Sequence, residues 1–447
     1  MATPDDAALA HALAEAARPL RGSVEDFDPL IDLVGDARCV LVGEATHGTH
    51  EFYRLRAQLT KRLITEKGFC AVAAEADWPD AYRVNRFVRG LGSDVDAVDA
   101  LEAFQRFPAW MWRNADVLDF IGWLRTHNDT LEAREKVGFY GLDLYSLHSS
   151  IGAVLRYLER VDAQAASRAR YRYACFEHFG EDAQTYGYAT SFGLTPNCQR
   201  EVISQLLDLQ RERSNVLRRD GLALEDEQFE AEQNARVVRS AEEYYRSMFQ
   251  GRVSSWNLRD THMAETFDAL LAHLALRFEQ PKIVVWAHNS HVGDARATQM
   301  GGAGELNLGQ LTRERHPGDT ILIGFSTYTG TVTAASSWGA AVERKQVRPG
   351  LRGSCEDLFH RVGIPSFLLP LRDLGEVTGA LRERRLQRAI GVIYLPQTER
   401  LSHYFETSLP SQFDAIFHLD RTRALEPLER TAGWEKGDAP ETFPSGI

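Results

Sequence analysis

Short apolar runs alternate with amphipathic stretches over the first third of the chain. The apolar runs have the length and composition of buried strands, and they cover residues 38–43, 69–75 and 137–143. Between them, large hydrophobic residues recur every three or four positions, which predicts helices over 49–67, from about Pro79 onward and near 114–129. Strands separated by helices favour parallel pairing through right-handed crossovers. This part of the chain therefore predicts an α/β fold.

The strand pattern stops from about residue 148 to 278 and then resumes. Long charged segments with helical periodicity replace it, such as 198–219 and 225–250. Strand-like runs return at 282–287 and 320–325, with shorter ones near 366–370, 391–394 and 414–419. We expect a mostly parallel central sheet flanked by helices, interrupted by an inserted helical lobe over an active-site cleft. The predicted parts are 1–147 and 279–447 for the α/β core and 148–278 for the lobe.

Composition and charge narrow the class of protein. The chain has 447 residues, of which 44% are apolar and 26% charged, and these values are ordinary for a globular protein. Its net charge of −12 argues against a nucleic-acid partner, because phosphate binding needs a concentrated basic surface. No apolar run approaches the roughly 18 residues that a membrane span needs. The acidic N-terminus lacks the basic start and apolar core of a signal peptide.

The five cysteines are scattered, and none forms a C-x-x-C pair. We therefore expect neither a disulfide framework nor a cysteine-based zinc site. The expected protein is reduced, soluble and cytoplasmic, without a nucleic-acid or membrane partner, and it is a monomer or a weak homo-oligomer.

Ionisable residues follow three of the predicted strands. Glu44 and His47 come after the first strand, and Glu75 ends the second, with Asp77 two residues on. His288 and His291 follow the strand at 282–287. The carboxyl ends of parallel strands lie on one edge of a sheet, where ligands bind in open α/β folds. If these strands are parallel neighbours, the ionisable side chains converge on one site.

A histidine beside a carboxylate is suited to general-base chemistry. The carboxylate fixes the tautomer of the imidazole and makes it more basic, so that it can take a proton from water. A second histidine or an arginine could bind the oxyanion that then forms. No Ser, Thr or Cys stands out as a nucleophile, and no G-x-S-x-G elbow occurs, so direct attack by water fits better than an acyl-enzyme.

Other interpretations of the same residues stay open. Four histidines and several carboxylates are also the ligands of zinc or manganese sites, although there is no H-E-x-x-H motif. His50 is interpreted as facing solvent on the first helical turn. Asp143 either joins the site or caps the helix near residue 148. A protein that binds a hydrophobic small molecule without turnover, or an inactive accessory unit of a biosynthetic pathway, would present similar patterns.

Several motifs together resemble the erythromycin esterase family. They are Gly43-Glu44-x-x-His47-Gly48-x-x-Glu51-Phe52, Glu75 at the end of a strand, Ala287-His288-Asn-x-His291, Trp256-Asn-Leu-Arg-Asp-x-His-Met263 and Phe413-Asp-Ala-Ile-Phe-His418. The resemblance extends from about residue 25 to the C-terminus. It implies an α/β sheet with a helical lobe over a deep cleft. It also implies hydrolysis of macrolide lactones by water, with a histidine as general base and no requirement for metal.

The resemblance also implies roles for particular residues. The general base falls at His47, the supporting acidic residues at Glu44, Glu51 and Glu75, and the second histidine at His288, with His291 beside it. The arginine of the family's site falls at Arg56. Helical spacing alone would not pair Arg56 with Glu51, since the two point about 140° apart, and Arg54 is a nearby alternative.

The resulting hypothesis is a hydrolase that needs no metal or other cofactor. His47, helped by Glu44 and Glu75, activates a water that attacks an ester or lactone carbonyl. His288 stabilises the oxyanion or protonates the leaving alkoxide. The lobe and an aromatic stretch near 104–112, with Trp110 and Trp112, would enclose a large, largely apolar substrate, for which a macrolide is the leading candidate. A metal-dependent hydrolase and a binding protein without turnover remain the alternatives.

Overall fold

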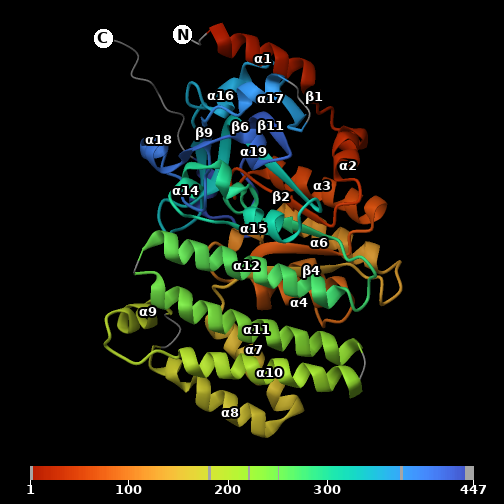
Figure 1. Cartoon of the computed structure of the whole chain (residues 1–447), viewed down its shortest axis with the longest axis vertical. Coiled ribbons are helices and arrows are strands. Elements are labelled where there is room, and N and C mark those ends of the chain that lie inside the picture. Colours follow the sequence, from red (N-terminus) through yellow and green to blue (C-terminus); the bar gives the residue numbers. More distant parts are fainter. Residues whose placement is uncertain (1–3, 180–182, 220–221, 250, 373–375, 438–447) are drawn as a thin grey trace. The chain divides into compact units, whose positions relative to one another are not determined.

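The computed structural model describes residues 4–179, 183–219, 222–249, 251–372 and 376–437. The chain divides into two compact units, whose elements are labelled in Figure 1. The first unit comprises Met1–Cys70, Asp94–Leu131 and Lys282–Ile447, and the second comprises Ala71–Ser93 and Glu132–Pro281. Each unit thus joins segments that lie far apart in the sequence. The division into parts 1–147, 148–278 and 279–447 stays a prediction.

The first unit contains a mixed sheet with parallel strands at its centre. Within this unit the strand order is β1-β8-β11-β6-β2-β5, and β7 also pairs with β6. The neighbours β5, β2, β6 and β11 run parallel, while β8, β1 and β7 pair antiparallel. The strands are β1 (Arg18–Pro19), β2 (Cys39–Val42), β5 (Ile283–Trp286), β6 (Thr320–Ala334), β7 (Glu343–Val347), β8 (Ser366–Pro370) and β11 (Ala415–Thr422). A separate antiparallel pair is formed by β9 (Arg385–Arg388) and β10 (Tyr404–Thr407).

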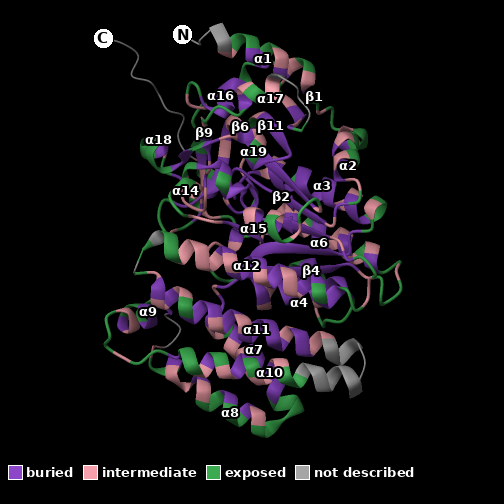
Figure 2. Cartoon of the chain, in the orientation of Figure 1, coloured by how far each residue is buried: buried purple, intermediate pink, exposed green. Residues whose placement is uncertain are grey.

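Burial explains why the central strands were predictable. Every residue of β2 and β5 is buried, and a parallel strand covered on both faces has an unbroken apolar sequence. In Figure 2, the sheet around the label β2 is coloured mainly as buried. The strand expected near 391–394 is wrong, because that segment makes only isolated bridges, such as Ala335 with Ile393. Strand β7 was missed because its sequence, Glu-Arg-Lys-Gln-Val, is mostly polar.

Helices of the first unit begin and end close to the predicted positions where the periodicity was strong. Helix α3 (His50–Lys67) buries Phe52, Leu59 and Leu63 and stops at Gly68, which has a φ of 71°. The other helices are α1 (Pro4–Ala16), α2 (Asp28–Val34), α5 (Ala97–Leu101), α6 (Ala115–Asn128), α13 (Asn289–Val292), α14 (Gln299–Gly302), α15 (Leu308–Arg315), α16 (Cys355–His360), α17 (Glu376–Leu381), α18 (Glu399–Ser402), α19 (Leu409–Gln412) and α20 (Ala432–Lys436). Short 3₁₀ turns are η1 (Val24–Phe27), η2 (Ala109–Met111), η4 (Ala295–Ala297) and η5 (Pro396–Thr398).

The second unit combines a parallel strand pair with long helices. The pair is β3 (Ala71–Asp77) and β4 (Gly138–Asp143), and its register shifts between Ala74 and Asp77. Gly141 permits this irregularity, because a Cβ there would lie 2.4 Å from the backbone oxygen of Ala76. The helices are α4 (Trp78–Val88), α7 (Leu147–Val161), α8 (Ala163–Tyr173), α9 (Ala183–Ser191), α10 (Gln199–Arg219), α11 (Leu222–Ser247) and α12 (Arg252–Leu274), with the 3₁₀ segment η3 (Ala174–Phe179).

The expectation of a fully reduced protein is wrong, because the described residues contain a disulfide. Cys175, in η3, is bonded to Cys198, which directly precedes α10, with their Cα atoms 6.0 Å apart. The two cysteines are 23 residues apart in sequence, and only the packing of the helices brings them together. Disulfides persist mainly in oxidising surroundings, and the cytoplasmic location stays a prediction. The remaining cysteines, Cys39, Cys70 and Cys355, are buried thiols.

The predicted fold class is confirmed: the protein is a mixed α/β structure with a central sheet flanked by helices. Among the described residues, no helix combines the length and the apolar character that crossing a bilayer requires.

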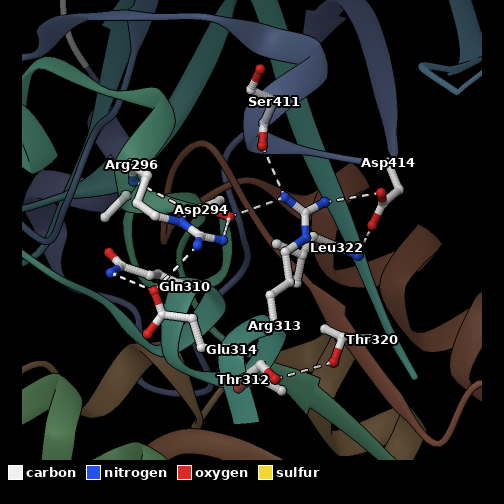
Figure 3. A network of polar contacts seen from close by, with 12 residues as sticks. Asp294, Arg296, Gln310, Thr312, Arg313, Glu314, Thr320, Leu322, Ser411 and Asp414 are labelled. Atoms are coloured by element: carbon white, nitrogen blue, oxygen red, sulfur yellow. Dashed lines mark hydrogen bonds and ion pairs between the residues drawn. The ribbon is translucent and has the colours of Figure 1, made fainter. Parts of the chain in front are cut away.

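An ionic network built on two buried carboxylates, Asp294 and Asp414, fixes the segment that follows β5 and α13 (Figure 3). Asp294 accepts hydrogen bonds from Arg296 Nη2 at 2.6 Å and from Arg313 Nη1 at 3.3 Å. Arg313 also pairs with Asp414 at 2.9 Å, and Asp414 accepts from the backbone N–H of Leu322 in β6 at 2.7 Å. The network therefore ties η4 and α15 to the central sheet, next to the segment that carries His288 and His291.

Replacing Asp294 should reveal this network as a pH-dependent stabilisation. Burial alone would raise the pKa of Asp294, but hydrogen bonds and charge from Arg296, together with the charge of Arg313, lower it. A carboxyl whose pKa is lower in the folded state stabilises the protein above its unfolded pKa of about 3.9, and this stabilisation is lost as the pH falls. We expect Asp294→Asn to lower the free energy of unfolding by about 2 kcal/mol at pH 7, with a difference from the parent that shrinks below about pH 4.

Urea unfolding at pH 7 and at pH 3.5 measures both effects. The matched control is Glu314→Gln, which removes the exposed partner of the same Arg296 and should cost less than about 1 kcal/mol. A difference between parent and Asp294→Asn that is independent of pH would contradict the assignment of the effect to this carboxylate.

Candidate active site

The carboxyl ends of β2 and β5 lie side by side in the first unit. The two strands run parallel, with Val42 opposite Trp286. Glu44 follows Val42 by two residues, and His288 follows Trp286 by two residues. The backbone N–H of Asn289 donates to the backbone oxygen of Glu44 at 2.8 Å, so the two strand ends are joined directly. This is the convergence that the sequence predicted for Glu44 and His288.

Gly43 makes this close approach possible. A Cβ at Gly43 would lie 2.1 Å from Oδ1 of Asn289 and 3.1 Å from the backbone oxygen of Ile323. The side chain of Asn289 occupies that space and bonds twice to the backbone of Phe325 in β6, donating to its oxygen at 2.8 Å and accepting from its N–H at 3.3 Å. Asn289 therefore fixes the turn that carries His288 against the neighbouring strand.

The loop that carries His47 is held by backbone hydrogen bonds on several sides. The backbone N–H of His47 donates to the backbone oxygen of Ile390 at 3.3 Å. The backbone oxygen of Gly48 accepts from the N–H of Thr333 at 2.9 Å and from the N–H of Leu425 at 2.8 Å. A Cβ at Gly48 would lie 1.8 Å from the oxygen of Thr333, so only glycine fits there. These contacts come from distant parts of the chain and set the position of His47 before any ligand binds.

A buried triad of side chains lies at the centre of this region. Nδ1 of His47 is 2.9 Å from Oε1 of Glu44, and Nη1 of Arg56 is 3.3 Å from Oε2 of the same carboxylate. The side chains are 8%, 2% and 0% exposed for His47, Glu44 and Arg56. A buried carboxylate needs such partners, because removal from water disfavours its charge. With the Nδ1 proton directed at Glu44, Nε2 is the ring nitrogen of His47 that can accept a proton.

Arg56 reaches Glu44 from the second turn of α3. Its guanidinium lies over the rings of Tyr53 and Trp286, at 4.4 and 4.7 Å from the ring centroids. Trp286 is itself fixed by a hydrogen bond from Nε1 to Thr60 Oγ1 at 2.9 Å. The structure therefore pairs Arg56 with Glu44 and leaves Arg54 exposed. Helical spacing relative to Glu51 does not reveal the partner of Arg56, because that partner, Glu44, precedes the helix.

His288 is the second histidine at this position. Its ring centroid is 4.8 Å from that of His47, and the planes are inclined by 46°. Nδ1 of His288 accepts from the backbone N–H of Ser290 at 3.2 Å and lies 2.8 Å from its hydroxyl oxygen. In the neutral ring this hydrogen bonding assigns the proton to Nε2. His47 and His288 thus differ in tautomer, so that the first is suited to accept a proton and the second to donate one.

Glu51 and His50 form a separate group at the start of α3. Glu51 accepts from the backbone N–H of Arg423 at 2.9 Å and pairs with its Nε at 3.2 Å. His50 lies 2.8 Å from Asp116 through Nδ1 and 2.7 Å from Arg423 through Nε2. The interpretation of His50 as a solvent-facing residue is therefore wrong, since both of its ring nitrogens have protein partners. Among the described residues, Glu51 therefore pairs with Arg423 rather than with Glu44 or His47.

The remaining predicted residues have the following surroundings. His291 is buried on α13. Trp110 and Trp112 are buried around η2, and in the described part of the chain Nε1 of Trp110 has no hydrogen-bond partner. Glu75 belongs to the second unit, where it pairs with Arg259 at 2.7 Å.

Sequence reasoning did not assign roles to several residues of the two units. Asn289 and Gly43 belong to the motifs named above. The packing of the Asn289 side chain over Gly43, however, depends on the register of β2, β5 and β6. Arg259 lies in the motif Trp256–Met263 on helix α12. It does not follow a strand, which was the criterion by which the other candidate residues were found. Asp143 was expected to join the site or to cap a helix, and it pairs with Arg259 at 2.7 Å.

The described residues contain no cluster of three or more His, Cys, Asp or Glu side chains arranged to hold a metal ion. The Nδ1 atoms of His47 and His288 are engaged by Glu44 and Ser290.

Solved structures with a similar fold cover almost the whole chain. A crystal structure of a succinoglycan biosynthesis protein matches with a TM-score of 0.74 at 22% identity, over 95% of this chain and 100% of the other. A mutant of the erythromycin esterase EreC, in its open conformation, matches with a TM-score of 0.63 at 18% identity, over 94% of this chain and 98% of the other. At this level of identity, the likeness shows a shared fold.

Sequence relatives also match over almost the whole chain. Erythromycin esterase type II of Escherichia coli is 23% identical over 420 residues, which are 90% of this chain and 94% of the relative. The putative hydrolase YbfO of Bacillus subtilis (strain 168) is 21% identical over 433 residues, 92% of this chain and 90% of the relative. The model of the erythromycin esterase family matches residues 64–422, a range that includes Glu75 and His288 and begins after Glu44, His47 and Arg56. Because this match spans most of the chain, the protein belongs to the erythromycin esterase family and is a hydrolase.

Proposed function

We propose that this hydrolase opens an ester or lactone bond in a large, largely apolar small molecule, with a macrolide such as erythromycin as the leading candidate. The observation that carries the proposal is the buried Glu44–His47 pair beside His288. A proton acceptor and a proton donor lie next to each other, as the addition of water to a carbonyl followed by loss of an alkoxide requires.

The reaction begins with water. Nε2 of His47 takes one proton while the water oxygen attacks the carbonyl carbon of the substrate. The carbonyl π bond becomes an oxyanion, which the Nε2–H of His288 stabilises. The oxyanion then re-forms the carbonyl as the C–O bond to the alkoxide breaks. The alkoxide receives the proton that His47 took from water, either directly or through His288, which gives up its Nε2 proton and is reprotonated by His47. The products are an acid and an alcohol, which stay joined when the substrate is a lactone. No covalent intermediate is needed.

Arg56 acts through Glu44. Its positive charge balances the buried carboxylate, so that Glu44 stays ionised and both of its oxygens are fixed, one toward His47 and one toward Arg56. The participation of Glu75 in this reaction, and of Glu51, His291, Trp110 and Trp112 in holding the substrate, stays a prediction. The absence of a metal or other cofactor requirement is part of the same proposal.

The names of the sequence relatives guide the choice of substrates. The Escherichia coli relative is named as an erythromycin esterase, which supports a macrolide, whereas the Bacillus subtilis relative is named only as a putative hydrolase. The experimental panel therefore contains 14- to 16-membered macrolides together with simple esters.

We expect the purified protein to add one water to at least one member of this panel, and His47→Ala to slow that reaction by about 10² to 10⁴-fold. Mass spectrometry of the incubated substrate detects the added water, and the initial rate gives the effect of the substitution. The matched control is His127→Ala, which removes a partly exposed histidine that stacks on Trp123, and it should keep the parent rate.

Three outcomes would contradict the proposal. Retention of an unchanged macrolide indicates binding without turnover, and failure across the whole panel indicates an inactive accessory protein. Loss of activity on chelation, with recovery on adding Zn²⁺ or Mn²⁺, indicates a metal-dependent hydrolase.

Glu44→Gln should lower kcat by about 100-fold or more with little change in KM. A neutral amide no longer selects the Nδ1–H tautomer of His47 or stabilises the imidazolium, and the analogous change in serine proteases is similarly damaging. The substitution also leaves Arg56 without a buried counter-charge, so thermal unfolding is measured alongside the kinetics.

The control for that loss of stability is Glu399→Gln, which breaks another buried pair of the same unit, with Arg388 at 3.1 Å. Equal losses of kcat in the two variants would mean that Glu44 matters only for folding.

A further inference from the structure

A second buried ionic group lies in the second unit, at the carboxyl ends of β3 and β4. Arg259, from α12, donates to Asp143 twice, from Nε to Oδ1 at 3.0 Å and from Nη2 to Oδ2 at 2.7 Å. The same Nη2 donates to Oε1 of Glu75 at 2.7 Å. One guanidinium therefore joins carboxylates from two adjacent parallel strands.

Asp143 fixes the plane of that guanidinium. Two parallel N–H···O bonds define the orientation of an arginine far better than a single contact does. Asp143 is itself held by the backbone N–H of Leu144, which donates to Oδ1 at 2.8 Å. The guanidinium carbon lies 5.0 Å from the ring centroid of Tyr145, whose hydroxyl is 3.2 Å from that of Tyr244. Arg259 consequently has little rotational freedom, and Nη2 is fixed where it meets Glu75.

Arg259 supplies positive charge to this group. The side chains of Arg259, Glu75 and Asp143 are 14%, 4% and 5% exposed, so the carboxylates need a nearby cation to remain ionised. Burial alone would lower the pKa of Arg259, but Asp143, then Tyr145 and Glu75, raise it well above its ordinary value.

The histidine one turn further along α12 does not supply this charge. Burial first, and then the charges of Arg236 and Arg239, lower the pKa of His262 to about 3, so it is neutral at pH 7.

The backbone around Glu75 explains why its side chain needs a fixed partner. Glu75 lies in the segment where the pairing of β3 with β4 shifts register, between Ala74 and Asp77. Such irregularities direct side chains away from the regular alternation of a strand. The contact with Arg259 fixes the direction that the irregular strand leaves open.

We propose that Arg259 is a positioning residue that holds Glu75 ionised and in one orientation for hydrolysis, with Asp143 as its anchor. This inference rests on the proposed function and on the predicted part of Glu75 in it. Arg259 then serves Glu75 as Arg56 serves Glu44. Since a guanidinium does not give up its proton in proteins, the role is electrostatic and geometric.

Kinetics and the titration of Glu75 in three variants test the proposal. In Arg259→Gln, Glu75 should take up its proton at higher pH than in the parent, because loss of an adjacent positive charge favours the protonated carboxyl. At neutral pH, kcat should fall about tenfold or more with little change in KM. Arg259→Lys keeps the charge but cannot bridge both carboxylates, so the titration of Glu75 should stay near that of the parent while kcat falls. Asp143→Asn should lower kcat without moving the titration of Glu75 as far as Arg259→Gln does.

The matched control is Arg89→Gln. It breaks a different buried pair of the same unit, with Asp226 at 2.9 Å, and should lower stability without moving the titration of Glu75. The same displacement of that titration in Arg89→Gln and Arg259→Gln would overturn the proposal, because a general loss of stability would then explain both.

A readout independent of turnover separates this proposal from the proposed function. Carboxyl ¹³C NMR of glutamate-labelled protein follows the titration of Glu75, whose signal is identified by its loss in Glu75→Gln. We expect Glu75 to titrate at higher pH in Arg259→Gln than in the parent, and an unchanged titration would overturn the proposal. If the parent hydrolyses no ester or lactone, the proposed function fails, while a shifted titration still supports the hold of Arg259 on Glu75. A shifted titration with unchanged kinetics in an active enzyme would overturn the positioning role.

Discussion

The site depends on a single buried carboxylate that is shared between a histidine and an arginine. Glu44 is almost fully removed from water, and it stays charged because His47 and Arg56 each engage one of its oxygens. The contact with His47 selects the tautomer, and the contact with Arg56 balances the charge. Removal of either partner leaves the buried carboxylate less well compensated and therefore affects its contact with the other partner. The chemistry proposed for His47 is therefore a consequence of how Glu44 is buried.

Backbone geometry makes this burial possible. The parallel pairing of β2 with β5 places the segments after Val42 and Trp286 side by side, and glycines at positions 43 and 48 let neighbouring chain segments approach within distances that a Cβ would forbid. Asn289 then occupies the space above Gly43 and ties the His288 turn to β6. The strand pair of the second unit has a similar arrangement. The missing side chain of Gly141 allows the irregular backbone of β3 to approach, and Arg259 fixes Glu75. In both units an arginine from a helix neutralises a carboxylate at a strand end.

The sequence predicted the parts of this arrangement that leave a local signal. Continuous apolar runs marked β2 and β5, because strands covered on both faces need them, and the ionisable residues directly after those runs marked Glu44, His47 and His288. The partner of Arg56 was not predictable from helical spacing, since Glu44 lies before the helix and is reached through the tertiary fold. The same holds for Arg259 with Glu75 and for the Cys175–Cys198 bond, both of which are set by packing between separate elements. Strand β7 pairs with the preceding strand β6 and was missed because its sequence is mostly polar.

The central claim is that Glu44 holds His47 in the tautomer with the proton on Nδ1, so that Nε2 is the base. Nitrogen-15 NMR of protein labelled in its histidine rings tests this most directly, because protonated and unprotonated ring nitrogens have well-separated shifts. Above the pH at which His47 takes up its second proton, the account predicts a protonated Nδ1 and an unprotonated Nε2 for His47, and loss of this preference in Glu44→Gln. A proton on Nε2 in the parent, or the same tautomer mixture in parent and Glu44→Gln, would contradict it.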